Sequence, residues 1–323
     1  MQFDREARAL WMTARNKAAL RTTPYDVPDT HVVIETMFTG ISKGTEKLVF
    51  EGRVSHGEHE TMRAPFQEGD FSFPVKYGYA AVGRLLDGAG AGDIVFALFP
   101  HQDYFSIPVE AALSVPPDVP AARAVLAANM ETALNILWDA GVQAGDRVVV
   151  VGCGVVGALV GYLARRIPGT EVCLCDIDPG RATLADTLGC NFALPDEAPN
   201  TADVVIHASA TAAGLATAIA LAGVEATVVE ASWYGEGTTQ VPLGGRFHQR
   251  RLRLLSSQVG RIPPSHAARW THRRRLQVAL SLLADPTLDA LISGETRFEE
   301  LAVAYSAILG DPQTLCHRVR FDD

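Results

Sequence analysis

The chain has 323 residues, of which 48% are hydrophobic and 20% charged, and its net charge is −9. This length suits two domains better than one core, and the composition is that of an ordinary globular protein. The acidic balance argues against a general affinity for nucleic acid or for acidic membrane surfaces. Because no apolar run has membrane-spanning length and the N-terminus is too charged for a signal peptide, we expect a cytoplasmic protein.

The five cysteines form neither a CxxC pair nor a Cys/His cluster with metal-ligand spacing. Cys173 and Cys175 lie two residues apart on a predicted strand, so their side chains point the same way, and both belong to an apolar run. We therefore expect small core residues in a reducing compartment rather than metal ligands.

From residue 7 to about residue 115 the sequence consists of short β segments that Gly, Pro and Asp interrupt. The segments cover residues 7–14, 16–22, 31–38, 76–86 and 93–98. Such a series predicts a small irregular barrel or folded sheet rather than a parallel one. The polar stretch Ser55–Phe73 predicts a long loop.

The pattern changes at Pro116, where a proline-marked segment opens a helix, up to about residue 142, that is apolar almost all round and hence buried. Strands then alternate with helices. The strands are expected at 147–151, 172–175, 203–207, 225–231 and 251–257, and the helices between them at 155–166 and 212–222. This alternation predicts an α/β protein with a doubly wound parallel sheet. Two further helical stretches, 273–285 and 298–311, are expected to return to the N-terminal domain.

A glycine turn joins the first of these strands to its helix. In a dinucleotide site Gly152 permits the sharp turn, Gly154 lets a pyrophosphate approach the backbone, and Gly157 lets the helix pack closely on the strand. The first helical turn, with Val155 and Val156, presents free N–H groups to the phosphates. Because an acid ends the next strand about 20 residues later, as the motif requires, we predict a dinucleotide site.

That acid, Asp176, bears on which dinucleotide binds. Its carboxylate can accept hydrogen bonds from the adenosine ribose hydroxyls of NAD, whereas it would lie against the extra phosphate of NADP. Two like charges ~4 Å apart at an effective dielectric of about 20 repel by ~4 kcal/mol, so NAD is favoured. Arg181 is close enough in sequence to soften that repulsion. Asp178, followed by Pro179, predicts the N-cap of the next helix.

The order of a β-rich domain, a nucleotide domain and a helical return resembles the medium-chain dehydrogenase/reductase superfamily, which includes alcohol dehydrogenases. Residues 38–46, 74–83 and 288–305 carry the resemblance together with the glycine turn and Asp176. It implies a six-stranded Rossmann sheet plus a GroES-like domain. The implied division is 1–123 for the GroES-like substrate and catalytic domain, 124–255 for the Rossmann domain, and 256–323 for the return to the catalytic domain.

Within that superfamily, GISKGTEKLVFEGR (40–53) is most similar to the GIS-x-GTE-KL segment of the bacteriochlorophyllide a dehydrogenases. This match is short and does not by itself transfer a tetrapyrrole substrate.

The zinc-dependent members hold catalytic zinc with a Cys in the first motif, a His-Glu pair in the second, and a Cys or Glu before the nucleotide domain. At the matching positions this chain has Ser42, then Tyr79 and Ala80, and then Ala128. The four-cysteine lobe that holds structural zinc in many relatives is also missing. Because zinc needs three or four such ligands, we predict a zinc-free branch.

Three residues near the lost ligands are candidates to polarise the substrate oxygen while the nicotinamide exchanges hydride. Tyr79 can donate a hydrogen bond or, with a lowered pKa, a proton. Thr45 matches the Ser or Thr that begins the proton relay of zinc-dependent members, and Lys43 is a fixed positive charge. The structural alternatives are a packed strand tyrosine, a cap for a helix beginning at Glu46, and a surface lysine. His101, in a loop, is a further candidate acid.

Ser209 and Trp233 complete the predicted cofactor contacts, because both follow strands whose carboxyl ends collect ligands in such sheets. Tyr234 can border the same site, and the alternative for both aromatic residues is a packed loop. The arginines of 246–253 and 269–275 can recognise an anionic small-molecule substrate or form a solvated face. By resemblance, residues 251–260 are the expected homodimer interface.

Three functions are consistent with these residues. The first is a zinc-independent, NAD-dependent dehydrogenase/reductase that acts on an alcohol/carbonyl pair. The second is a zinc-free reductase of a conjugated C=C bond or a quinone, which a preference for NADPH would indicate. The third is a non-catalytic protein that binds NAD as a sensor or scaffold.

Overall fold

The computed structural model describes residues 6–321 and divides into two compact units, each described by itself below. Unit 1 joins the stretch up to Ala128 with the stretch from Leu280 onward, and unit 2 is Asn129–Ala279. Two helices contain the division points, α3 (Ala127–Ala140) and α8 (His272–Ser281). None of the helices within 6–321 combines the length and the apolar character that crossing a membrane requires.

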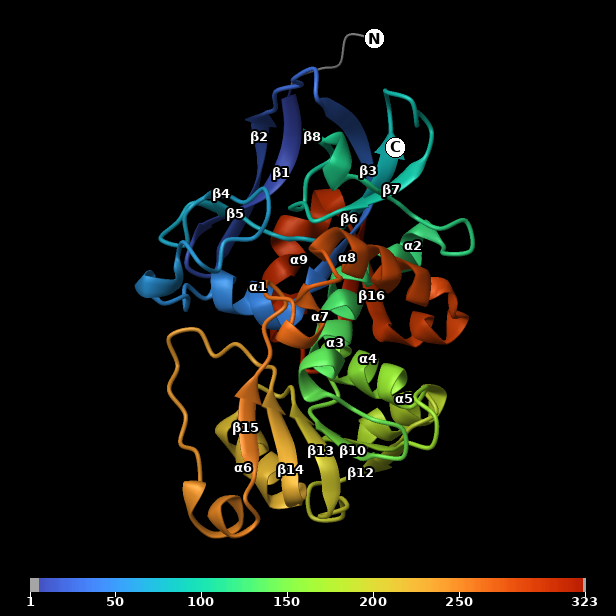
Figure 1. Ribbon diagram of the computed structural model, residues 1–323. Coiled ribbons are helices and arrows are strands. Elements are labelled where there is room, and N and C mark those ends of the chain that lie inside the picture. Colours follow the sequence, from blue (N-terminus) through green and yellow to red (C-terminus); the bar gives the residue numbers. More distant parts are fainter. Residues whose placement is uncertain (1–5, 322–323) are drawn as a thin grey trace. The chain divides into compact units, whose positions relative to one another are not determined.

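Unit 2 is built on a six-stranded parallel sheet with the strand order β12-β11-β10-β13-β14-β15 (Figure 1). The strands are β10 (Arg147–Val151), β11 (Glu171–Cys175), β12 (Asn191–Ala193), β13 (Ala202–His207), β14 (Ala222–Glu230) and β15 (Arg253–Ser256). The helices are α4 (Val155–Ala164), α5 (Ala182–Thr187), α6 (Ala212–Leu221) and α7 (Pro264–Ala267). The strand order reverses between β10 and β13, which confirms the predicted doubly wound Rossmann sheet.

Each face of this sheet receives its own helix because successive strand residues point to opposite sides. On one face α4 lies so close that a Cβ on Gly161 would be 2.6 Å from the Leu174 side chain. On the other face Cys173 and Cys175 share a core cluster with Leu215 of α6. The prediction that both cysteines point into one buried core is confirmed.

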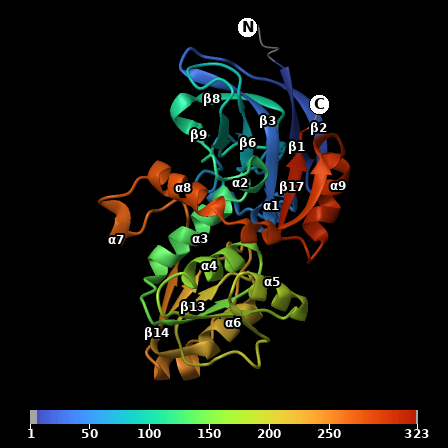
Figure 2. The same ribbon diagram turned by 90° about the vertical axis from the view of Figure 1, so that its right-hand side faces the viewer.

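Unit 1 contains two further sheets (Figure 2). A four-stranded sheet has the order β2-β1-β5-β4, and a seven-stranded sheet has the order β16-β17-β3-β6-β7-β9 with β8 paired to β3. The strands are β1 (Glu6–Ala14), β2 (Lys17–Pro24), β3 (His31–Ser42), β4 (Glu68–Gly69), β5 (Val75–Lys76), β6 (Ala81–Leu85), β7 (Ile94–Ala97), β8 (Tyr104–Pro108), β9 (Leu113–Ser114), β16 (Ile292–Arg297) and β17 (Cys316–Arg320). All their pairings are antiparallel except that of β16 with β17, so a β-rich N-terminal fold is confirmed.

The helices of unit 1 are short apart from the last. They are α1 (Lys43–Phe50), α2 (Ala121–Ala124) and α9 (Phe298–Gly310), with single turns at His56–Glu58, Val109–Ala111, Leu282–Ala284 and Pro286–Leu291. The predicted loop Ser55–Phe73 contains only one such turn and the two-residue strand β4, as expected. The helix predicted from residue 116 is divided into α2 and α3.

One expectation for unit 1 was wrong, and two strands in the tail were missed. Residues 76–86 do not form one strand, because β5 ends at Lys76, β6 starts at Ala81, and Gly78 between them has a φ of +134°. Tyr79 therefore sits in an irregular segment rather than on a pleated strand. In the tail the helix predicted over 298–311 exists as α9, but the flanking strands β16 and β17 were not predicted.

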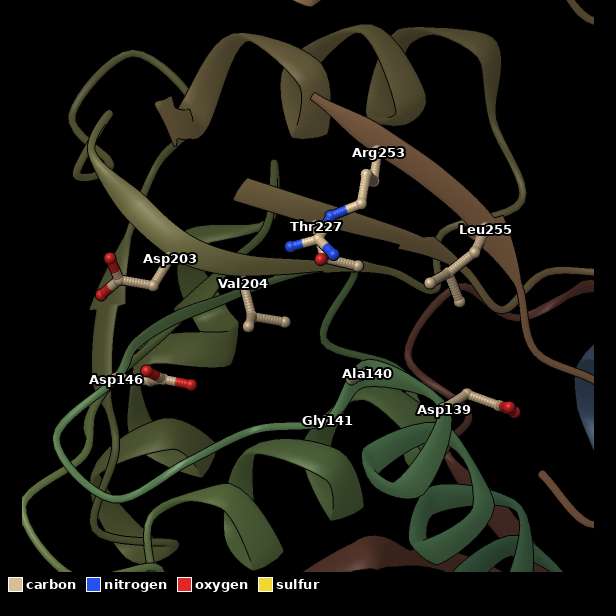
Figure 3. Close-up of a pocket in the computed structure, with 9 residues that line it drawn as sticks. All are labelled: Asp139, Ala140, Gly141, Asp146, Asp203, Val204, Thr227, Arg253 and Leu255. Carbon is tan, nitrogen blue, oxygen red and sulfur yellow. The ribbon is translucent and has the colours of Figure 1, made fainter. Parts of the chain in front are cut away.

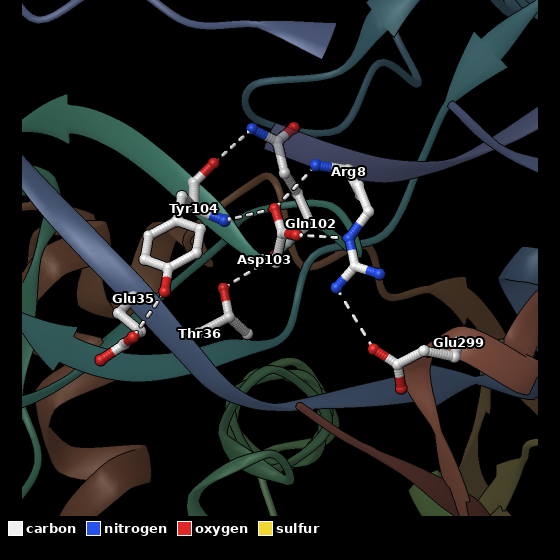
Figure 4. Close-up of polar contacts among 7 residues, drawn as sticks. All are labelled: Arg8, Glu35, Thr36, Gln102, Asp103, Tyr104 and Glu299. Atoms are coloured by element: carbon white, nitrogen blue, oxygen red, sulfur yellow. Dashed lines mark hydrogen bonds and ion pairs between the residues drawn. The ribbon is translucent and has the colours of Figure 1, made fainter. Parts of the chain in front are cut away.

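Polar contacts join the first strand, the β7–β8 connection and the tail helix of unit 1 (Figure 4). The Arg8 guanidinium donates to the carboxylate of Asp103 at 3.0 Å and to that of Glu299 at 3.2 Å. Next to them the Thr36 hydroxyl donates to the carbonyl of Gln102 at 2.5 Å. These bonds hold the segment that carries His101 in place.

Candidate functional site

The glycine turn of unit 2 has the geometry that its sequence predicts. Gly152 has a φ of +104°, and a Cβ there would lie 2.7 Å from the backbone nitrogen of Ser209. A Cβ on Gly157 would lie only 1.9 Å from the carbonyl oxygen of Gly152. A Cβ on Gly154, the N-cap of α4, would meet nothing within 4 Å. The two outer glycines serve the protein's own packing, while the open space at Gly154 fits a pyrophosphate at the start of the helix.

This difference gives a matched pair of variants. Gly157→Ala forces the helix away from the strand, so we expect a loss of about 1–3 kcal/mol in the free energy of unfolding, as for other overpacked sites. Gly154→Ala should cost less stability than Gly157→Ala, because only the N-cap preference for glycine is lost, and should weaken NADH binding about tenfold or more, because the methyl group occupies the phosphate's space. Thermal melts and NADH fluorescence titrations of both variants check this. Equal NADH affinity of Gly154→Ala and wild type would contradict the assignment of the cradle.

Asp176 lies at the end of β11 and is fixed against the turn. One carboxylate oxygen accepts the N–H of Cys153 at 2.6 Å and the other accepts the N–H of Asp178 at 3.0 Å. Asp178 accepts the N–H of Gly180 at 2.9 Å with Pro179 following it, so the predicted N-cap is confirmed. The Arg181 guanidinium lies 3.7 Å from the Asp178 carboxylate, which makes Asp178 one of its partners.

A second polar cluster occupies the ends of β13 and β14. His207, which is fully buried, contacts the Glu230 carboxylate through Nδ1 at 2.7 Å and the Ser209 hydroxyl through Nε2 at 2.7 Å. Ser209 also lies 3.0 Å from the Thr211 hydroxyl, and the Tyr234 hydroxyl donates to Glu230 at 3.1 Å. Burial alone would raise the pKa of Glu230, but the hydrogen bonds that its carboxylate accepts from His207 and Ser232 outweigh the burial, and the pKa is lowered.

Sequence reasoning selected Ser209 from this cluster but missed His207 and Glu230. A signal was available, because both are polar residues that end apolar strands, and adjacent parallel strands bring their ends together. Tyr234 belongs to the cluster through Glu230. Trp233 stays a predicted cofactor contact.

In unit 1 the structure brings together two of the three predicted catalytic residues. Ser42 is the N-cap of α1, Thr45 lies in its first turn, and the Tyr79 phenol hydrogen-bonds with both hydroxyls. Burial, opposed by these two bonds and assisted by the charge of Glu46, raises the pKa of Tyr79 to about 12. A phenol with this pKa is protonated at neutral pH and can donate a hydrogen bond. The alternative in which Thr45 caps a helix beginning at Glu46 is wrong, since α1 begins three residues earlier, at Lys43.

Beneath these hydroxyls lies a fully buried carboxylate, Glu46. It accepts the N–H of Ser42 at 2.7 Å and the hydroxyl of Tyr305 at 2.6 Å, and it lies 3.0 Å from Nε2 of His101. The other ring nitrogen of His101 lies 2.7 Å from the hydroxyl of Thr39. This Glu46 network satisfies the buried charge and anchors the N-cap residue that holds Tyr79.

Lys43 is engaged elsewhere. Its ammonium group donates to the carbonyl of Asp311 and, at 3.5 Å, to that of Thr314. It therefore ties the start of α1 to the segment between α9 and β17. The catalytic role predicted for Lys43 draws no support from these contacts.

The residues at the predicted metal positions do not fit a zinc ion. Ser42 and Tyr79 offer hydroxyls that bond to each other, and Ala128 offers no donor. Glu46 and His101 are possible ligands by type, but they bond to one another. Within residues 6–321 no group of three or more His, Cys, Asp or Glu side chains is placed to hold a metal.

Several arginines that could have recognised an anion serve the protein's own structure instead. Arg246 donates to the carbonyl of Ala220, and Arg250 donates to that of Ala222 at 2.5 Å. Arg275 is buried and donates to the Glu131 carboxylate at 3.0 Å. These three arginines are therefore weaker candidates for binding an anionic substrate than the sequence predicts.

A cavity of about 370 Å³ lies in unit 2 at the amino ends of the strands, whereas the glycine turn lies at their carboxyl ends (Figure 3). Asp146, just before β10, and Asp203, near the start of β13, line it together with Arg253 and Asp139. Ligands of open α/β sheets bind outside the carboxyl ends of the strands, whereas this cavity lies at the amino ends. We therefore do not assign it to the dinucleotide.

Comparisons with known proteins agree with this architecture. No family model matches the chain. The sequence is 28% identical over 172 residues to D-guloside 3-dehydrogenase of Escherichia coli, covering 49% of this chain and 48% of that protein. It is 27% identical over 147 residues to (R,R)-butanediol dehydrogenase of Bacillus subtilis, covering 45% and 39%. The matched stretch thus spans less than half the length of these curated relatives.

Solved structures match over almost the full length. L-idonate 5-dehydrogenase of Escherichia coli superposes with a TM-score of 0.81 at 15% identity, covering 98% of both chains. An alcohol dehydrogenase of Escherichia coli CFT073, solved with NADH, gives 0.76 at 16% identity over 99% and 100%. The fold is thus the medium-chain dehydrogenase/reductase fold. The closer similarity to bacteriochlorophyllide a dehydrogenases stays a prediction.

Proposed function

We propose that this protein is an NAD-dependent oxidoreductase that transfers hydride between the nicotinamide and an alcohol/carbonyl substrate without zinc. The observation that carries the zinc-free part is the Tyr79 phenol, held by Ser42 and Thr45 where zinc ligands would stand. The dinucleotide part rests on the glycine turn with its open space at Gly154. The sequence relatives, both dehydrogenases, support the reaction class.

When bound, the nicotinamide supplies the hydride chemistry. The protein must bind the substrate and stabilise negative charge on its oxygen. The protonated Tyr79 phenol donates a hydrogen bond to that oxygen, while Ser42 and Thr45 orient the phenol and the Glu46 network fixes Ser42. One well-aimed donor is worth about 2.7–4 kcal/mol in the transition state, a large part of what a metal ion would contribute.

The preference for NAD over NADP belongs to the same proposal. Asp176 is bound to the turn through Cys153 and cannot swing away without breaking a 2.6 Å hydrogen bond. One partner of Arg181 is Asp178, which limits how far it can compensate an added phosphate. A fixed carboxylate favours two ribose hydroxyls over a phosphate.

The proposal is tested on protein freed of metal by dialysis against a chelator and checked by elemental analysis. We expect NADH oxidation with a panel of aldehydes and ketones, or NAD reduction with the alcohols, at a rate that added zinc does not increase. Activity that appears only with stoichiometric zinc would overturn the zinc-free mechanism. Reduction of quinones or enones with NADPH would support the second function instead, and tight NAD binding without any hydride transfer would support the third.

We also propose that two copies of this chain form a homodimer through the edge of the six-stranded sheet. β15 is the last strand of the six-stranded sheet, and Arg253, Leu254 and Ser256 are exposed on it. A strand at the edge of a sheet offers unpaired backbone groups to a second copy.

A further inference from the structure

The cluster at the ends of β13 and β14 lies where the second half of a dinucleotide is expected. Asp176, at the end of β11, belongs to the side that takes the adenosine ribose. The strand order β11-β10-β13 puts the end of β13 on the other side of the glycine turn. The turn also touches the cluster directly, because a Cβ on Gly152 would lie 2.7 Å from the nitrogen of Ser209. A dinucleotide spread across this switch point brings its nicotinamide half to Ser209.

Glu230 and His207 determine what the Ser209 hydroxyl can do. The carboxylate accepts a hydrogen bond from the Nδ1–H of His207, so Nε2, which carries no hydrogen in the neutral ring, is an acceptor. The Ser209 hydroxyl then donates to Nε2, and its oxygen lone pairs remain for other donors. Thr211 can fill one of them at 3.0 Å. The arrangement therefore presents one remaining acceptor position on Ser209.

The backbone around Ser209 leaves room for its hydroxyl. A Cβ on Gly214 would lie 2.1 Å from the Ser209 oxygen and 2.7 Å from Nε2 of His207. Ala210, the next residue, has a φ of +54°, and its N–H donates to the Ser232 hydroxyl at 3.0 Å. A left-handed conformation is unfavourable for a residue with a side chain, and such strained positions concentrate at functional sites.

We propose that Ser209 accepts a hydrogen bond from an N–H or O–H donor on the nicotinamide half of the dinucleotide, and that His207 and Glu230 are positioning residues acting through it. The donor is either the carboxamide or a hydroxyl of the nicotinamide ribose. This inference rests on the proposed function, since it needs a dinucleotide in the cradle.

The test measures dissociation constants by calorimetry for three ligands: AMP, ADP-ribose and NADH. Ser209→Ala should weaken NADH about fivefold to tenfold, the effect of one net hydrogen bond, and leave AMP unchanged. If ADP-ribose weakens as much as NADH, the donor is the ribose; if ADP-ribose is unaffected, the donor is the carboxamide. Thr201→Ala is the control. Thr201 is exposed at the amino end of β13, away from the glycine turn, and its hydroxyl accepts a hydrogen bond from the Arg147 guanidinium at 2.9 Å.

The positioning part is tested by a double-mutant cycle. Glu230→Gln should weaken NADH while sparing AMP, and adding it to Ser209→Ala should cause no further loss, because both act through one hydroxyl. Additive losses, unchanged NADH affinity in Ser209→Ala, or an equal loss of AMP would each overturn the inference. A wild-type protein that binds AMP but not NADH would instead overturn the proposed function.

Discussion

Replacing Asp176 by alanine should remove most of the preference for NAD over NADP. The variant loses the acceptor for the adenosine ribose hydroxyls of NAD and loses a charge that repels the added phosphate of NADP. Removal of a repulsion of ~4 kcal/mol at most corresponds to a change of up to about a thousandfold in relative affinity. We expect the ratio of the NADP to the NAD dissociation constant to fall by about 10²-fold to 10³-fold, measured by fluorescence titration with both reduced forms.

A second substitution at Asp176 separates charge from hydrogen bonding. The carboxylate also accepts the backbone N–H groups of Cys153 and Asp178, so alanine removes structural bonds as well. Asp176→Asn removes the charge but keeps one acceptor oxygen for the turn, so it loses one of the two structural bonds instead of both. It should show most of the gain in NADP affinity with a smaller loss of thermal stability. Unchanged discrimination in both variants would show that another group selects the dinucleotide.

Replacing Tyr79 by phenylalanine should remove most of the turnover while NADH affinity stays the same. The phenol supplies the donor to the substrate oxygen, and loss of one such donor typically costs about 10²-fold to 10³-fold in kcat. Tyr77→Phe is the matched control. Its ring packs edge-on against Tyr79 with the centroids 6.0 Å apart, so the change removes a neighbouring hydroxyl without altering the ring packing. Similar turnover in the two variants would mean that another residue polarises the substrate.

The pH dependence follows from the raised pKa of Tyr79. Because that pKa is about 12, the phenol keeps its proton throughout the neutral and mildly alkaline range. The rate of carbonyl reduction should therefore show no loss from Tyr79 ionisation between about pH 7 and pH 10 and should decline only as the pH approaches that pKa. A limb near neutral pH that disappears in Tyr79→Phe would contradict a phenol buried in its neutral form.

The parts of the site that could be predicted from sequence are those with local steric or spacing requirements. Gly152 is required by its own φ of +104°, Gly157 by its contact with the carbonyl of Gly152, and Asp178 caps the helix that begins next to it. The alternation of strands and helices predicted the sheet of unit 2 because each βαβ step has a strongly preferred hand. In unit 1 a motif match placed Tyr79 and Thr45 near the lost metal ligands.

What could not be predicted depends on contacts between distant residues. Glu46 and Tyr305 are separated by 259 positions, and their hydrogen bond turns a first-turn acid into the centre of a buried network. The sequence shows His101 only as a loop histidine, because its contact with Glu46 joins residues 55 positions apart. The Lys43 ammonium donates to the carbonyls of Asp311 and Thr314, which lie 268 and 271 positions away in the sequence. Such contacts depend on tertiary packing, and the hydrophobic periodicity of the sequence does not predict them.

The pairing of β17 with β3 affects the order in which the two units can fold during synthesis. This strand runs between β16 and β3, so residues 316–320 supply the hydrogen bonds of a strand translated some 280 residues earlier. Residues 129–279 have their complete sheet as soon as they leave the ribosome. Unit 1 is therefore completed only after unit 2, and until β17 has been made residues 38–42 of β3 lack the strand that pairs with them.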